Sequence, residues 1–151
     1  MPIELTWLLP DKILLSRWTG EVSEDDMRVV IEETRIILEA ANGLIHTVVE
    51  LVDVNHISTD GVYLFIESNI PKHPNHGRIC VVNPTFESEV LADMTNRVFQ
   101  LDMLRLFDSQ EEARDFLLAH DNPPPALDTN RLPSCQAGMA VPPPEKPGAP
   151  E

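Results

Sequence analysis

The chain has 151 residues with 25 acidic and 11 basic side chains, a formal net charge of −14, and a length that favours one domain. Hydrophobic residues make up 42% of the chain, which is enough for a core, but no apolar run approaches the roughly 20 residues that span a bilayer. Nucleic acids and anionic membranes attract clustered lysine and arginine, which this acidic chain lacks. We therefore expect no nucleic acid partner and no membrane span.

The start of the chain and its cysteines indicate a reducing compartment. Met1 to Leu9 contain Glu4 and lack a basic stretch followed by a long apolar run, so we expect no secretory signal and a cytoplasmic location. Cys80 and Cys135 lie far apart in regions of different composition. This arrangement argues against a disulfide framework and against a four-ligand zinc site.

The composition changes near residue 121. Nine of the 14 prolines lie between Asp121 and Glu151, where large apolar residues are few. Such a segment cannot bury enough surface to offset the entropy lost on ordering. We therefore predict a folded domain over residues 1–120 and a disordered, proline-rich tail over residues 121–151. Its two proline triplets leave a second interpretation open, namely short polyproline II segments that bind an aromatic groove of a partner.

The first part of the chain predicts a hairpin and a helix. Ile3–Leu9 and Lys12–Thr19 are apolar runs separated by the turn pair Pro10-Asp11, which predicts two antiparallel strands. Ser23, followed by three acidic residues, is typical of a helix N-terminus. Apolar residues at helical spacing then continue to the stop signal Asn42-Gly43.

Strands and helices alternate through the rest of the domain. The predicted strands are Ile45–Val54, Arg78–Val82 and Met103–Phe107. One helix is predicted over Asp60–Ile70. A second begins at Thr85 and has apolar residues at every fourth position (Phe86, Val90, Met94 and Val98). A third follows the capping sequence Ser109–Glu112. The β-branched first strand of this set is typical of a strand covered on both faces. The pattern predicts an α/β fold with a mostly parallel sheet and one antiparallel edge.

The segment Val48–Gly61 contains Glu50-Leu51 and, after a short interval, Ser58-Thr59-Asp60-Gly61. It resembles the central motif of STAS domains, the family of bacterial anti-sigma-factor antagonists and sulfate-transporter tails, in which a strand ending in Asp-Leu precedes Asp-Ser-Ser/Thr-Gly at a helix start. Phe107–Ala113 resembles the last strand-to-helix passage of the STAS/SEC14-like, stage II sporulation AA-like branch. The resemblance covers nearly all of residues 3–118. It implies a STAS-like fold with a mixed, mostly parallel sheet, an N-terminal antiparallel hairpin and about four helices.

The resemblance also implies a phosphorylation switch at the start of the second helix. In characterised STAS antagonists, a partner kinase phosphorylates the serine after the aspartate of the motif, and this releases the partner. Thr59 falls at that position, whereas Ser58 replaces the aspartate and Asp60 follows the acceptor. The sequence is equally compatible with a chain that has no phosphorylation switch and that the fixed charge of Asp60 locks in one state. A purely structural alternative is that Ser58 or Thr59 only caps the helix.

A non-enzymatic regulatory module that binds a protein partner, such as an anti-sigma factor or a kinase, is the function that the resemblance implies. The expected phosphosite candidates are Thr59 and Ser58, and the expected partner-binding residues are Asn55, His56, Asp60 and Gly61. A homodimer remains open. The SEC14-like branch implies an alternative, a carrier or sensor of a small apolar ligand.

Enzymatic and metal-binding functions find little support in the sequence. It has no nucleophile elbow, no dinucleotide-binding motif and no P-loop, so we expect no enzyme activity and no cofactor. Glu50, Asp53 and His56 keep an enzymatic hypothesis open, because ligands of open α/β sheets bind at the carboxyl ends of the strands. The spacing of His73 and His76 matches no zinc motif, so we predict no metal site.

Overall fold

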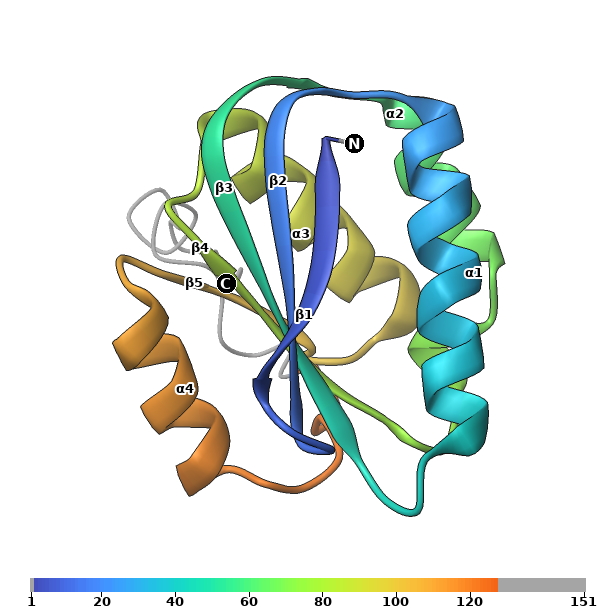
Figure 1. Ribbon diagram of the computed structural model, residues 1–151, viewed down its shortest axis with the longest axis vertical. Helices are drawn as coiled ribbons and strands as arrows, with labels where there is room; N and C mark the ends of the chain where they lie inside the picture. The colour runs from blue at the N-terminus through green and yellow to red at the C-terminus, as the bar shows by residue number, and fades with distance from the viewer. Residues whose placement is uncertain (1, 128–151) are drawn as a thin grey trace, which may run out of the picture.

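The computed structural model describes residues 2–127 as a five-stranded sheet with helices on both faces (Figure 1). The strands are β1 (Ile3–Leu9), β2 (Ile13–Val22), β3 (Ile45–Ile57), β4 (His76–Val82) and β5 (Leu104–Phe107). The helices are α1 (Glu24–Ala40), α2 (Thr59–Glu67), α3 (Phe86–Phe99) and α4 (Gln110–Ala119), with a 3-10 turn η1 (Ile70–Lys72). The strands follow one another across the sheet in chain order.

The sheet is mixed, as the sequence predicts. β1 pairs with β2 in antiparallel fashion, and β2, β3, β4 and β5 are parallel neighbours. Asp11 takes up a positive φ of 62° in the turn of the hairpin, a conformation that aspartate tolerates better than most residues. The prediction of an α/β fold with an antiparallel hairpin at one edge is therefore confirmed.

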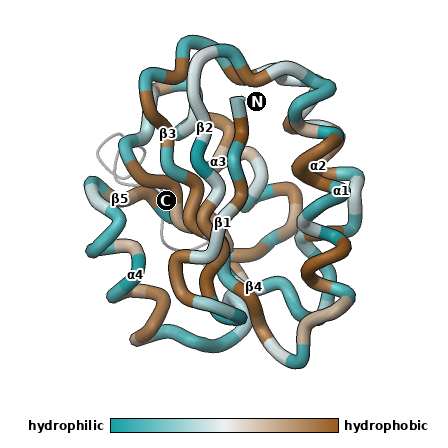
Figure 2. Tube along the Cα trace, viewed as in Figure 1, coloured by the Kyte–Doolittle hydropathy of each residue, from teal (hydrophilic) through white to brown (hydrophobic). Residues whose placement is uncertain are grey.

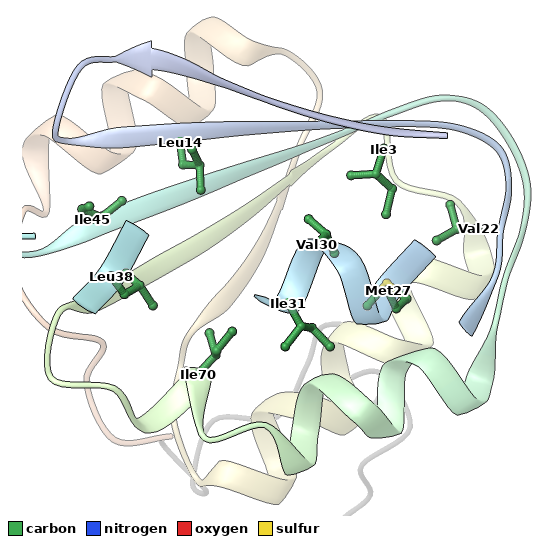
Figure 3. Close-up of a cluster of buried hydrophobic side chains, with 9 residues drawn as sticks. All are labelled: Ile3, Leu14, Val22, Met27, Val30, Ile31, Leu38, Ile45 and Ile70. Carbon is green, nitrogen blue, oxygen red and sulfur yellow. The ribbon is translucent and has the colours of Figure 1, made fainter. Parts of the chain in front are cut away.

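Both faces of the sheet are buried, because α1, α2 and α3 cover one face and α4 covers the other (Figure 1). A cluster on the first face joins α1 to β1, β2, β3 and η1, and it is drawn in Figure 3. On the other face, Ala113 and Leu117 of α4 pack with Val48 and Cys80 of the central strands. Hydrophobic stretches follow the strands, whereas α1 and α4 alternate in hydropathy as amphipathic helices do (Figure 2).

The ends of several elements differ from the predicted ones. β3 continues to Ile57, so the interval that separates the two halves of the STAS-like motif is strand and not turn. The second helix ends at Glu67, because Asn69 has a positive φ of 68° that no helix accommodates. Ser109 caps α4, but the carboxylate of Glu112 accepts from the N–H of Asp108, so the predicted capping box is incomplete. These ends depend on hydrogen bonds that a local pattern does not specify.

The chain after α4 pairs with the connection between α3 and β5. The carbonyl of Pro125 accepts from the N–H of Asp102 (2.8 Å), and Leu127 donates to the carbonyl of Gln100 (2.8 Å). These contacts extend the packed chain past the predicted domain end at residue 120. The rest of the predicted tail, residues 128–151, lies outside the described residues, as does Cys135. No helix within residues 2–127 is long and apolar enough to cross a membrane.

Candidate functional site

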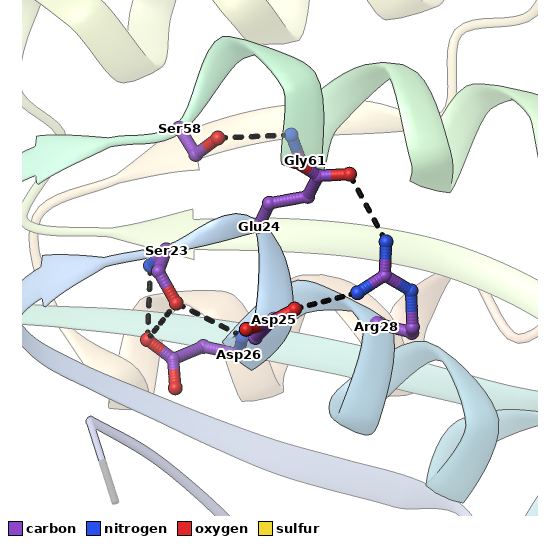
Figure 4. A network of polar contacts seen from close by, with 7 residues as sticks. All are labelled: Ser23, Glu24, Asp25, Asp26, Arg28, Ser58 and Gly61. Carbon is purple, nitrogen blue, oxygen red and sulfur yellow. Dashed lines mark hydrogen bonds and ion pairs between the residues drawn. The ribbon is translucent and has the colours of Figure 1, made fainter.

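Helices α1, α2 and α3 all begin at the edge of the sheet where the parallel strands β2, β3 and β4 end. The starts of α1 and α2 are joined directly, since the N–H of Ser58 donates to the carbonyl of Val22 at the end of β2 (2.9 Å). Figure 4 shows these two helix starts together. In open α/β sheets, ligands bind at this carboxyl end of the strands.

The strands are irregular just before this edge. Gly20 and Asp53 have positive φ values of 64° and 53°, and the pairing of β2 with β3 shifts register on both sides of Gly20. Such bulges bend a strand and redirect its side chains. After the bend, Asn55 and His56 are exposed, as expected of residues that contact a partner.

Ser58 and Thr59 have different roles at the start of α2. The Oγ of Ser58 accepts from the N–H of Gly61 (3.1 Å), so Ser58 is the N-cap that satisfies one of the unpaired helix donors (Figure 4). Thr59 is the first helical residue and is exposed. Within residues 2–127, the hydroxyl of Thr59 makes no side-chain hydrogen bond. The sequence left the capping role open between the two hydroxyls, and the structure gives it to Ser58.

Gly61 is buried in the contact between α2 and α1. A Cβ at this position would lie 2.5 Å from Cγ of Met27, closer than real Cβ atoms approach a neighbour, and 3.0 Å from its Cβ, which is a tight contact. The close approach that Gly61 permits is therefore an approach to α1. Direct contact of Gly61 with a partner, which the sequence analysis expected, does not fit this burial, because the residue packs against the side chain of Met27.

The charges around the start of α2 are mostly negative. Asp60 is exposed beside Thr59, and Glu24 and Asp25 lie in the first turn of α1. Arg28 pairs with both of these α1 carboxylates, with N to O distances of 3.0 Å and 2.6 Å (Figure 4). Exposed pairs of this kind contribute little stability, but they leave Arg28 partnered within its own helix.

Large apolar side chains are exposed near the same edge. Tyr63 lies one turn after Thr59 on α2 and is 48% exposed, while Phe86 and Val90 lie one turn apart on α3 and are 82% and 50% exposed. The carboxylate of Glu87 accepts from the N–H of Ile57 (3.1 Å), which fastens the first turn of α3 to the end of β3. Aromatic residues are enriched at protein interfaces.

The exposed apolar side chains of α3 were not predicted from the sequence. The apolar residues at every fourth position of α3 predicted the helix correctly, but its buried residues are Ser88, Ala92 and Thr95. Phe86, Val90 and Val98 of the predicted stripe are exposed instead. The signal that could have revealed this is that α3 has two faces that suit burial, one with large apolar residues and one with small residues. The face with small residues packs inward, so the large apolar residues face outward.

The residues of the enzymatic hypothesis do not converge. Glu50 is half-buried and accepts from Nε of Arg17 (2.9 Å) and from Nε2 of Gln110 (3.0 Å) on the side of α4. His56 lies at the end of β3, with its Nδ1 3.4 Å from the carboxylate of Glu87 on α3. Asp53 is exposed at the bend of β3. Each group has its own surroundings, so no shared site for a substrate results.

The loop histidines differ in burial, although the N–H of His76 donates to the carbonyl of His73 (2.9 Å). His73 is half-buried, whereas His76 is the first residue of β4 and is only 5% exposed. Within the part of the chain that the structure describes, no group of three histidine, cysteine or acidic side chains could hold a metal ion. Burial raises the pKa of the Cys80 thiol to about 12, which keeps this cysteine protonated and unreactive.

A polar cluster at the opposite end of the parallel strands was also not predicted from the sequence. Nδ1 of His46 accepts from the N–H of Arg78 (2.9 Å), and its Nε2 donates to Asp121 (2.9 Å), whose other oxygen binds Nζ of Lys12 (2.5 Å). The hydrogen bonds from Lys12 and His46 lower the pKa of Asp121. Every polar atom of His46 is used in these contacts, so the cluster is structural and holds residue 121 against β3.

Comparisons with known proteins support the fold. No family model matches the sequence, and no curated protein matches it. Among solved structures, an uncharacterized protein with a SpoIIAA-like fold from Shewanella loihica has a TM-score of 0.57 at 14% identity, over 76% of this chain and 91% of its own.

Two structures of SpoIIAA itself are similar in the same way. The anti-sigma factor antagonist SpoIIAA in its unphosphorylated form has a TM-score of 0.57 at 12% identity, over 78% of this chain and 96% of its own. The Bacillus cell fate determinant SpoIIAA in the phosphorylated form has a TM-score of 0.54 at 13% identity, over 76% of this chain and 98% of its own. At these identities the similarity concerns the fold alone. The chain is therefore an α/β domain with a SpoIIAA-like fold.

Proposed function

We propose that this chain is a non-enzymatic, cytoplasmic regulatory module that binds a protein partner at the starts of α2 and α3. The docking surface consists of Thr59, Asp60 and Tyr63 on α2 and of Phe86 and Val90 on α3. The observation that carries the proposal is an exposed hydroxyl at the start of α2, together with an exposed tyrosine one turn later on α2 and an exposed phenylalanine at the start of α3. Asn55 and His56, at the exposed end of β3, lie at the border of this surface.

The docking surface defines the chemistry of the partner. Tyr63 and Phe86 offer aromatic area that a partner buries at little cost in side-chain entropy. Asp60 and the acidic first turn of α1 lie around it, in a chain of net charge −14. A complementary partner presents an apolar pocket with basic residues at its rim. A kinase or an anti-sigma factor with such a pocket is the class of partner that we propose.

Phosphorylation of Thr59 would weaken this docking. A phosphate adds nearly two negative charges beside Asp60 and one turn from Tyr63. Burial of Tyr63 against a partner would then require removing water from the phosphate, which is costly. Because Thr59 is exposed and Ser58 is engaged as the N-cap, Thr59 is the acceptor that we propose.

The test uses the full chain to capture its partner from the source cells, followed by titration of the purified partner. Thr59→Glu introduces a fixed charge at the proposed acceptor, and Phe86→Ala removes the most exposed aromatic side chain. Thr6→Glu is the matched control, because Thr6 is an exposed threonine on the edge strand β1. We expect Thr59→Glu and Phe86→Ala each to weaken binding about tenfold or more, since truncating a hot-spot residue of an interface costs about 2 kcal/mol or more and tenfold corresponds to about 1.4 kcal/mol.

Two results would contradict the proposal. A partner that binds the wild type and all three variants with one affinity would place docking elsewhere on the chain. The other result is self-association of the purified chain in sedimentation experiments that Phe86→Ala abolishes. It would identify the surface as a homodimer contact instead.

A further inference from the structure

The outer edge of strand β1 is open. β1 lies at one end of the sheet and pairs with β2 (Figure 1). The N–H of Thr19 donates to the carbonyl of Pro2 (2.8 Å), and the two strands keep one register from this pair as far as Trp7. Along an antiparallel ladder every second residue directs its backbone groups to the neighbouring strand, so the groups of Ile3, Leu5 and Trp7 point away from β2.

These outward groups are unpaired. No other part of residues 2–127 hydrogen-bonds to the N–H or carbonyl groups of Ile3, Leu5 and Trp7. β1 is seven residues long, contains no lysine or proline, and has Glu4 as its one charged side chain. Lysine, proline and short length are common means by which an edge strand avoids pairing with another chain. β1 therefore has few of the features that block the addition of a strand.

The edge strand β5, on the other side of the sheet, differs from β1. The side chain of Asn96 accepts from the N–H of Leu104 (2.9 Å) and donates to its carbonyl (3.0 Å). The carboxylate of Glu112 accepts from the N–H of Asp108, just after the strand (3.3 Å). Side chains of the same chain thus occupy backbone groups at both ends of this four-residue strand. β1 is therefore the more accessible of the two edges.

We propose that β1 pairs with β1 of a second copy of this chain, in antiparallel orientation, so that the two sheets form one continuous sheet. Two copies related by a two-fold axis present the same edge to each other, and this is the commonest symmetry of homodimers. The sequence left a homodimer open without indicating a surface for it. The unpaired edge of β1 supplies that surface.

The outward groups restrict the register of this pairing. When Leu5 lies opposite Leu5 of the second copy, Ile3 lies opposite Trp7 of the second copy, and all three residues exchange hydrogen bonds. The three side chains share one face of β1, because alternate residues do. Ile3 and Leu5 pack in the cluster beneath α1, whereas Trp7 is 39% exposed and gains an apolar neighbour in the dimer. The edge is thus complementary to itself, which favours a second copy over an unrelated strand.

The charge of Glu4 supports the same register. With Leu5 on the two-fold axis, Glu4 lies opposite Thr6 of the second copy, so the two carboxylates are apart. A shift by two residues in one direction places Glu4 opposite Glu4 of the second copy, and like charges directly opposite each other are destabilising. A shift in the other direction pairs Ile3 with Leu9, which lies beyond the irregularity in β1.

Dimerisation through β1 is independent of the docking surface for a protein partner. β1 is at the edge opposite to β5, whereas α3 packs on β3 and β5, so Thr59 and Phe86 stay accessible in the dimer. The two interactions also respond oppositely to salt. Two chains of net charge −14 repel each other, so NaCl should strengthen the dimer, whereas it should weaken binding of a partner with a basic rim.

Sedimentation equilibrium of the purified full chain tests the proposal. We expect a concentration-dependent dimer with twice the 16.9 kDa mass of one chain, and tighter association as the NaCl concentration rises. Thr6→Glu adds a carboxylate opposite each Glu4 and should weaken the dimer about fivefold, while Thr6→Lys should strengthen it by a similar factor. Thr59→Glu is the matched control, because it adds the same charge on α2, and Phe86→Ala should also leave the dimer unchanged.

A cysteine scan identifies the register. In a Cys135→Ser background, where the remaining native Cys80 is buried, Leu5→Cys should give a cross-linked dimer after oxidation with diamide. Residues in a hydrogen-bonded antiparallel pair have Cα atoms about 5.5 Å apart, which a disulfide can span. Glu4→Cys and Thr6→Cys are the controls, because both positions are exposed but neither lies opposite itself in this register. Non-reducing electrophoresis compares the three variants.

Several results would overturn the proposal. One is a chain that stays monomeric at all protein and NaCl concentrations, and another is a dimer that both Thr6 variants leave unchanged or that Phe86→Ala dissociates. Cross-linking of Glu4→Cys or Thr6→Cys in preference to Leu5→Cys would refute the pairing, as would the failure of all three to cross-link. Unchanged partner binding by Thr59→Glu and Phe86→Ala, with an intact dimer, would instead refute the docking surface alone.

Discussion

The buried imidazole of His76 makes the stability of this fold depend on pH. Burial lowers the pKa of His76 from 6.5 to about 4, and the nearby His46 and His73 contribute smaller effects in the same direction. The unfolded chain therefore takes up a proton near pH 6.5, whereas the folded chain takes it up only near pH 4. Because the unfolded state binds more protons within this window, the free energy of unfolding falls as the pH falls from 6.5 to 4.

The size of this loss follows from the two pKa values. The difference between 6.5 and about 4 corresponds to about 3 kcal/mol, since one pKa unit is worth about 1.4 kcal/mol. Typical domains have free energies of unfolding of about 5–15 kcal/mol, so this loss is readily measurable. Burial lowers the pKa of His46 as well, which adds to the loss in the same direction.

Urea unfolding at pH 7.5 and at pH 4 measures this effect. We expect the wild type to lose about 3 kcal/mol more than His76→Leu between the two pH values, because the variant lacks the titrating imidazole. His56→Gln, the replacement of an exposed histidine, should behave as the wild type does. Equal losses in the wild type and in His76→Leu would refute the reasoning, because another group would then cause the acid sensitivity.

Two further predictions concern the start of α2. Gly61→Ala should lower the free energy of unfolding by about 1–3 kcal/mol, because the new Cβ overlaps Met27, whereas Gly43→Ala, with no heavy atom within 4 Å of its Cβ, should cost little. Thermal unfolding of the two variants decides this, and equal melting temperatures would contradict the packing argument. Ser58→Ala should lower the free energy of unfolding by about 1 kcal/mol by removing the N-cap, while Thr59→Ala should change it by less than about 0.5 kcal/mol. A larger loss for Thr59→Ala in urea unfolding would assign the structural role to the other hydroxyl.

Much of the fold could be predicted because its signals are local. The turn pair Pro10-Asp11, the cap at Ser23 and the periodicity of each run concern residues within a few positions of one another. The ends of elements were less predictable. β3 extends to Ile57 because its last residues pair with the end of β2, and Glu87, from a distant part of the chain, accepts the N–H of Ile57.

The start of α2 was predictable in position, but its capping residue was not. The STAS-like motif located the start of α2, but either Ser58 or Thr59 was chemically able to cap it. The hydrogen bond from Gly61 to Ser58 resolved this choice in the structure. The exposure of Phe86 was not predictable from spacing, because an apolar stripe does not say which elements cover it.

The sequence by itself determined the order and type of the elements, the antiparallel hairpin and the cap of α1 at Ser23, because these depend on neighbouring residues. Only the tertiary structure decided that Phe86 faces outward, that Nδ1 of His76 is buried without a partner, and that Asp121 packs against His46. Each of these three properties depends on what distant elements cover or leave open. The burial of a side chain and its hydrogen-bond pairing depend on how the layers of the fold assemble, whereas the periodicity of apolar residues and the capping signals of helices are properties of the chain alone.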